Sequence, residues 1–145
     1  MTFLDCLKFA TENPACTVAT VDGDQPRARI FMTWRANESG FYLCTGTPKP
    51  VCQQLLANPK IELCFYKPGA TPEDLGAMMR VAGKVEFVGD VALKDELLTE
   101  WPFLKQMGIV GPDDPMLSLM RIASGEIRFW TTSPDMREQV EVVNF

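Results

Sequence analysis

Short runs in which apolar and polar residues alternate recur along the chain and predict strands with one buried face. In residues 60–67, for example, Ile61, Leu63 and Phe65 fall on one face of the expected strand. Six or seven strands are expected, at residues 16–21, 26–34, 41–45, 60–67, 79–87, 117–123 and 126–132. The last two are expected to pair across Ser124-Gly125. A polar tail from Ser133 then leads to a final short strand or arm at residues 140–143.

Helical patterns occur in three places. Residues 2–5 resemble a capping box, which predicts an N-terminal helix that ends at Asn13-Pro14. A short helix is expected to begin with Thr47 as its N-cap and Pro48 in its first turn, and to stop at Asn58-Pro59. Residues 91–107 predict a longer helix that Pro102 breaks in two.

Closely spaced hairpins without regular βαβ alternation favour a small antiparallel barrel over a doubly wound sheet. The expected hairpin signals include Asp22-Gly23-Asp24, and Gly83 inside the strand at 79–87 suggests a bulge. We therefore expect a mainly β fold, a β-barrel with peripheral helices, in a single domain over residues 1–145.

Composition narrows the possible environments. The chain has 145 residues, of which 46% are hydrophobic, and no apolar run approaches the ~20 residues that span a bilayer. Its start lacks the layout of a signal peptide, so we expect a cytoplasmic protein without a membrane anchor. A net charge of -5 argues against general nucleic-acid binding.

The chain contains five cysteines, no C-x-x-C pair and no histidine. This composition argues against zinc and iron–sulfur sites, so no metal is expected. It also excludes Ser-His-Asp and Cys-His catalysis and any histidine-ligated haem. If the protein is an enzyme, a cofactor is expected to carry the chemistry, and no catalytic side chain is assigned.

The turn between the strand at 41–45 and the next helix combines several groups that bind anions. Gly46 lies between the hydroxyls of Thr45 and Thr47, and Lys49 adds a positive charge near a helix start. Such an arrangement can hold a phosphate. The alternative, which the residues leave open, is a plain connection between a strand and a helix.

Arg27 and Arg29 lie two residues apart on one expected strand, so their side chains share a face with Phe31 and Thr33. Two arginines on an otherwise apolar face need either an anionic partner or open solvent. One reading brings an arginine to a phosphate beside Thr45, and the other leaves both at an exposed edge.

These segments, in this order, resemble the pyridoxamine 5'-phosphate oxidase-like family of FMN-binding split β-barrels. The resemblance rests on Pro26-Arg27-Ala28-Arg29, on the stretch from Thr45 to Leu55 with its T-x-x-x-K-P-V-x-x-Q-L pattern, and on residues 58–64, 79–85 and 101–105. The pattern is closest to the small members of the family and covers most of the chain.

The resemblance implies that the chain binds FMN and forms a homodimer with FMN at the shared interface. It places the phosphate-binding arginine at Arg29 and the flavin-lining strand at residues 30–34. The implied cofactor-binding residues are Arg27, Arg29, Ile30, Phe31, Met32, Thr33, Trp34, Cys44, Thr45, Gly46, Lys49 and Val51.

Three departures from the family pattern change the expected function. The oxidase has Ser-Arg-Lys where this chain has Lys49-Pro50-Val51, and a strand-end lysine where it has Trp34. Its C-terminal arginine-x-histidine element cannot exist in a chain without histidine, so oxidation of pyridoxamine phosphate is not expected. We expect an FMN-dependent oxidoreductase acting on a small molecule. The alternatives are a non-catalytic flavin store or redox sensor, and an empty barrel kept for dimerisation or partner binding.

Overall fold

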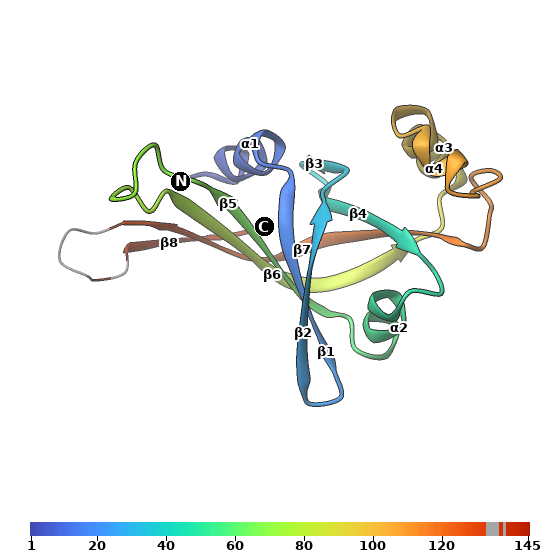
Figure 1. The fold of residues 1–145 in the computed structure, drawn as a ribbon, viewed down its shortest axis with the longest axis horizontal. Coiled ribbons are helices and arrows are strands. Elements are labelled where there is room, and N and C mark those ends of the chain that lie inside the picture. The colour runs from blue at the N-terminus through green and yellow to red at the C-terminus, as the bar shows by residue number, and fades with distance from the viewer. Residues whose placement is uncertain (133–136, 138) are drawn as a thin grey trace.

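One antiparallel sheet carries most of the fold in the computed structural model, which describes residues 1–132, 137 and 139–145 (Figure 1). Its strands lie in the order β2-β1-β5-β6-β7-β4-β3, and β8 adds to β7. The strands are β1 (Ala15–Asp22), β2 (Gln25–Met32), β3 (Arg35–Asn37), β4 (Gly40–Gly46), β5 (Lys60–Lys67), β6 (Ala77–Val88), β7 (Leu117–Thr131) and β8 (Gln139–Asn144). The helices are α1 (Phe3–Glu12), α2 (Pro50–Ala57), α3 (Val91–Glu100) and α4 (Phe103–Gln106).

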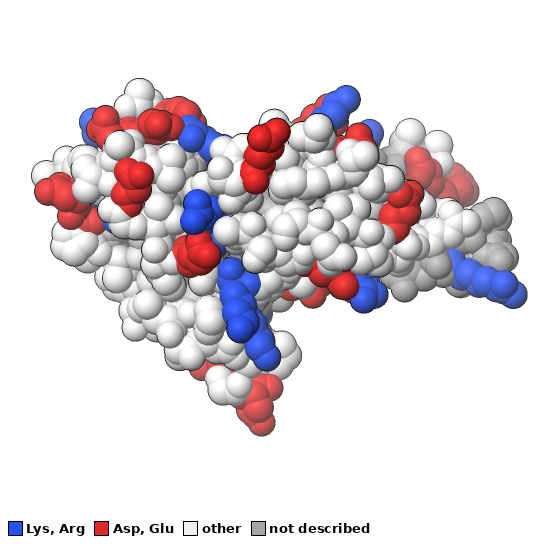
Figure 2. Space-filling model, turned by 180° about the vertical axis from the view of Figure 1, so that it is seen from behind, with Lys and Arg blue, Asp and Glu red and all other residues white. Residues whose placement is uncertain are grey.

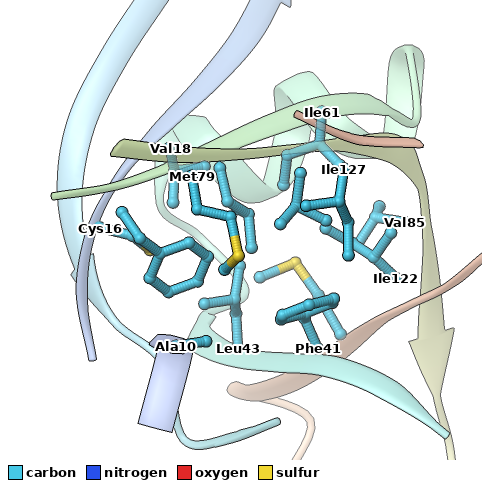
Figure 3. Packing of buried hydrophobic residues seen from close by; sticks show 14 of the residues in the cluster. Ala10, Cys16, Val18, Phe41, Leu43, Ile61, Met79, Val85, Ile122 and Ile127 are labelled. Carbon is cyan, nitrogen blue, oxygen red and sulfur yellow. The ribbon is translucent and has the colours of Figure 1, made fainter. Parts of the chain in front are cut away.

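The sheet curls around a single apolar interior, as a barrel does. Side chains from α1 and from β1, β4, β5, β6 and β7 meet there, including Val18, Phe41, Met79 and Ile127 (Figure 3). After β2, which pairs with β1, the chain runs across to β3, which pairs with β4. The N–H of Thr33 donates to the carbonyl of Pro14, and the N–H of Trp34 donates to that of Tyr42. The prediction of a mainly β barrel with peripheral helices is confirmed.

Local signals in the sequence placed several elements correctly. The hydroxyl of Thr2 accepts from the N–H of Asp5, whose carboxylate accepts from the N–H of Thr2, so the expected capping box begins α1. Gly23 turns the β1–β2 hairpin with a φ of 63°, a conformation that glycine adopts without steric cost. The expected helix at 91–107 is split into α3 and α4 at Pro102. The last strand is β8, whereas positions 133–136 and 138 of the polar tail lie outside the described residues.

The expected turn at Ser124-Gly125 is wrong, because β7 continues through it as one strand. Gly125 instead permits close contact with β6: an added Cβ would lie 2.1 Å from the carbonyl oxygen of Ala82. The register between β6 and β7 shifts beside Gly83, which confirms the irregularity predicted there. The two glycines therefore allow the long strands to bend together rather than to reverse direction.

The start of α2 also differs from the prediction. The helix begins at Pro50, and Lys49 is its N-cap residue in an extended conformation, without a side-chain cap. Thr47 is not the N-cap, because its hydroxyl donates to the carbonyl of Pro115 at 2.7 Å. Pro50 rather than Pro48 occupies the first helical position, where a missing N–H breaks no bond.

Helices α3 and α4 cover the outside of the sheet near β4 and β7. A second cluster of buried side chains holds them there, composed of Trp34, Tyr42, Leu97, Leu98, Leu104, Leu117 and Leu119. Within the described part of the chain, none of the helices is long and apolar enough to cross a membrane.

Candidate functional site

A pocket of about 430 Å³ opens where β2, the end of β4 and the segment around α4 come together. Pockets of this size are typical of small-molecule sites. Its walls are Ile30, Phe31, Met32, Cys44, Thr45, Gly46, Lys49, Trp101, Phe103, Leu104, Met107, Gly108, Ile109, Met116 and Leu117. Two segments that the sequence analysis singled out separately thus meet in one cavity, the strand after Arg29 and the turn after Thr45.

The pocket has one polar end. Lys49 lies there at the start of α2, with its side chain beside Gly46. Thr45 is only 6% exposed, and its buried hydroxyl has no hydrogen-bond partner within the described chain. A buried hydroxyl without a partner costs stability, which a ligand that supplies the missing bond would recover. These groups fit an anionic head group such as a phosphate.

Cys44 adds a neutral thiol to the same wall. Burial raises the pKa of Cys44 to about 11, although the positive charge of Lys49 acts in the opposite direction. The thiol therefore stays protonated at neutral pH, so it is a weak nucleophile. The chemical character of this end of the pocket comes from one ammonium and one hydroxyl.

Arg29 is not among the residues that line the pocket, although Phe31, two residues further along β2 and on the same face, is one of them. Its guanidinium donates to the hydroxyl of Thr20 at 2.6 Å and to the amide oxygen of Gln54 at 2.7 Å. Burial lowers the pKa of Arg29, and the neighbouring Arg27 adds to the effect. The partners found in the described residues are all neutral, so Arg29 holds a positive charge against α2, the helix that follows Lys49.

Four other residues implied by the resemblance also lie elsewhere. Arg27 forms an ion pair of 3.3 Å with Asp22 near the hairpin tip. Thr33 and Trp34 are buried beside the point where the chain crosses to β4, and Val51 packs in the main core. Direct contacts between these four side chains and a flavin stay a prediction, since the structure does not bring the side chains into the pocket.

The surface around the β1–β2 hairpin carries both acidic and basic side chains. Figure 2 shows a short row of basic side chains, interrupted by an acidic one, that leads toward the projecting end of the molecule, where acidic side chains lie at the tip. The hairpin itself carries Asp22, Asp24, Arg27 and Arg29. Its charges are thus mixed, and the hairpin does not form the broad basic surface that nucleic-acid binding requires.

One wall of the pocket was not predicted from the sequence. Trp101, Phe103, Met107, Ile109 and Met116 supply most of this wall from α4 and the loops around it. In the sequence, Trp101 and Phe103 appeared only within the expected helix at 91–107, and none of the five residues was among the implied cofactor-binding residues. A usable signal was present, because apolar residues continue past the helix break at Pro102 into a loop that turns at Gly108 with a φ of 101°.

A polar joint fixes the end of α3 next to this wall. The indole N–H of Trp34 donates to Glu100 at 2.8 Å, and Arg35 donates to the same carboxylate at 2.7 Å. Arg35 also lies 4.1 Å above the Trp34 ring, a cation–π contact. Because Trp101 directly follows Glu100, the joint positions the first aromatic residue of the wall.

Comparison with known proteins places the chain in a family context. A family model described as pyridoxamine 5'-phosphate oxidase matches residues 5–131. A pyridoxine/pyridoxamine 5'-phosphate oxidase from Pseudomonas putida (strain W619) is 36% identical over 92 residues, which cover 59% of this chain and 40% of that protein. The chain thus spans less than half the length of the curated relatives it matches.

Solved structures share the fold at low sequence identity. A NimC/NimA family protein from Clostridium acetobutylicum superposes with a TM-score of 0.78 and 24% identity over 99% of this chain and 92% of that one. A heme-binding protein from Mycobacterium smegmatis gives 0.76 and 16%, covering 98% of this chain and 57% of that one. An FAD-binding protein from Mesorhizobium loti gives 0.72 and 17%, covering 92% and 96%.

Proposed function

This chain belongs to the pyridoxamine 5'-phosphate oxidase family, and on that premise we propose that it binds FMN in the pocket between β2 and α4 and uses it as an oxidoreductase. The family resemblance inferred from the sequence is confirmed. The fold is compatible with more than one cofactor, since its structural neighbours include proteins described as FAD-binding and heme-binding. The choice of FMN therefore rests on the chemistry of the pocket.

The observation that carries the proposal is the single polar end of an otherwise apolar pocket. Lys49 and Thr45 both line the pocket: Lys49 brings a positive charge, and the buried hydroxyl of Thr45 has no hydrogen-bond partner among the described residues. FMN combines one phosphate with a large planar ring, so its two parts match the two parts of the pocket. Histidine, the residue that holds heme iron in many proteins, is absent from the sequence.

The chain's own residues would bind and orient the cofactor. Lys49 and Thr45 would hold the phosphate, with the charge of Arg29 nearby against α2. Strand β2 pairs only with β1 among the described residues, so backbone groups along its other edge are available to a ring lying beside Ile30 and Met32. When bound, FMN supplies hydride and electron transfer, and the protein sets its orientation and surroundings.

A second copy of the chain is part of the proposal. Ile30 and Met32 are 70% and 52% exposed, although both are large and apolar and lie on an edge strand. Such an edge is normally covered in a native protein. We propose that the partner chain of a homodimer covers this face and completes the flavin site.

A flavin store or redox sensor is the second candidate. In the described part of the pocket lining, only Lys49 and Cys44 carry titratable side chains, and the thiol is held protonated. A site without a side chain that can readily donate or accept a proton suits a bound flavin that exchanges electrons without proton transfer to a substrate. Oxidation of pyridoxamine phosphate is not proposed, because the chain lacks histidine.

The test begins with the visible spectrum of the purified protein and identification of the released chromophore. We expect a flavin spectrum, release of FMN, and calorimetric binding of FMN that is much tighter than binding of riboflavin. Reduction by NADH or NADPH with turnover of an acceptor would support the enzyme, whereas reduction without turnover would support the store or sensor. Equal affinity for riboflavin, or a heme spectrum in place of a flavin spectrum, would contradict the phosphate site.

A further inference from the structure

The pocket wall formed by α4 and its flanking loops differs chemically from the end at Lys49. We propose that this wall makes the site selective for uncharged aromatic substrates over anionic ones, an inference that rests on the proposed FMN site. The curated relatives are described as oxidases of phosphorylated vitamin B6 compounds, so this selectivity would separate the chain from them.

The described residues of this wall carry no charge. Among the described residues that line the pocket, Lys49 is the single charged one, and it lies at the opposite end beside Gly46. The proposed cofactor phosphate would occupy that charge. A carboxylate or phosphate on a substrate would then lose hydration without gaining an opposite charge, which is costly, whereas a neutral ring would not.

Two adjacent aromatic rings form part of the wall. Trp101 and Phe103 lie with their ring centroids 5.5 Å apart and their planes inclined by 33°. They present two adjoining aromatic surfaces, which attract a third ring by stacking or edge contact. The bonds of Glu100 to Trp34 and Arg35 hold the residue that directly precedes Trp101, where this segment begins.

The wall also includes two exposed methionines. Met107 is 67% exposed, and Met116 is also exposed at the pocket rim. Burying this apolar surface under a ligand is favourable, and the flexible thioether side chains adapt to rings of different outline. We therefore expect the wall to select for uncharged ligands more strongly than for ligands of one particular shape.

The test compares two probes of nearly equal shape, naphthalene-2-carboxamide and naphthalene-2-carboxylate, by equilibrium dialysis against the FMN-loaded protein. We expect the carboxamide to bind at least roughly tenfold more tightly. Met107→Lys should bring a positive charge to the wall and reduce or reverse that preference, while Met107→Leu should preserve it. The matched control is Val110→Lys, because Val110 is 89% exposed and does not line the pocket.

Three results would overturn the inference. The first is equal or tighter binding of the carboxylate, and the second is an equal shift in Met107→Lys and Val110→Lys. The third is failure of both probes to bind, which would mean that the partner chain covers the wall. Flavin absorbance is read in the same samples, so loss of FMN binding would reject the proposed function, whereas retained FMN without discrimination would reject only the substrate class.

Discussion

The indole N–H of Trp34 donates a hydrogen bond of 2.8 Å to the carboxylate of Glu100, which lies 66 residues further along the chain. Trp34 precedes β3, and Glu100 is the last residue of α3. The bond therefore joins the sheet to the helix whose continuation forms a wall of the pocket. In the oxidase pattern a lysine occupies the position of Trp34, so this chain uses the position to fix its own framework.

Removing the Glu100 carboxylate should destabilise the fold. Glu100→Ala leaves the nearly buried indole N–H of Trp34 without an acceptor, so we expect the free energy of unfolding to fall by about 1–2 kcal/mol. Glu96→Ala is the matched control, because Glu96 binds only the exposed side of the joint through Arg35, and its loss should cost about 0–1 kcal/mol. Urea denaturation measures both, and equal losses would show that the Trp34 bond contributes nothing.

Alkaline pH should destabilise the protein through its buried thiols. Burial raises the pKa of Cys16 and of Cys44 from the ordinary 9.0 to about 11. Between these values the unfolded chain releases the thiol protons while the folded chain retains them, so stability is complete below pH 9 and falls as the pH rises toward 11.

The loss at about pH 10 should be on the order of 1 kcal/mol for each thiol. Urea denaturation at about pH 8 and about pH 10 measures it, with Cys44→Ala as the comparison, because this variant lacks one of the thiols whose pKa burial raises. We expect the variant to lose less stability over the interval than the unaltered protein. The same loss in both would mean that the Cys44 thiol ionises as easily in the folded chain as in the unfolded one.

The proposed dimer gives a prediction about β2. Ile30→Asp would place a charge on an apolar residue that the partner chain is expected to bury, so the equilibrium should shift toward monomer by at least roughly tenfold. Leu4→Asp is the control, because Leu4 is an exposed apolar residue on α1, away from the projecting hairpin (Figure 1). Light scattering at several concentrations measures the mass, and a monomeric unaltered protein saturated with FMN would contradict the dimer.

Sequence patterns predicted the fold where a local signal has one structural meaning. The Thr2–Asp5 capping box and the turn at Gly23 are such signals, and both elements lie where they were expected. Gly125 shows the limit, because a glycine between apolar runs fits a turn as well as a close approach of two strands. Only the distance to Ala82, a residue more than forty positions away, separates the two possibilities.

Only one of the two walls of the candidate site was predicted from the sequence. The segments around Ile30 and Thr45 were found because the family resemblance marks both, and the structure brings them into one pocket. The opposite wall was missed because neighbouring apolar residues of one short segment serve both the core and the pocket: Leu104 packs in the second buried cluster, whereas Phe103 beside it is exposed at the pocket. Periodicity identifies an apolar face, but it does not show whether protein or ligand covers that face.

The last prediction compares the three cations near the proposed phosphate. Arg29→Ala should weaken FMN binding by roughly ten- to a hundredfold, because it removes a partly buried charge next to α2. Arg27→Ala should change affinity by about fivefold or less, since Arg27 is solvent-exposed and already pairs with Asp22. Lys49→Ala should weaken binding at least as much as Arg29→Ala, because Lys49 lines the end of the pocket that is proposed to hold the phosphate, whereas Arg29 lies outside the pocket wall.

Arg29 also bonds to Thr20 and Gln54, so its removal could act through the fold rather than through the phosphate. Arg29→Lys separates the two effects, because it keeps the charge and loses the fork of hydrogen bonds. If Arg29 acts by charge, this variant should recover much of the affinity lost in Arg29→Ala. Fluorescence titration of the apo-protein with FMN, alongside circular dichroism of every variant, measures the series. If Arg27→Ala proved the most damaging substitution, the phosphate would lie two residues closer to the hairpin tip than proposed.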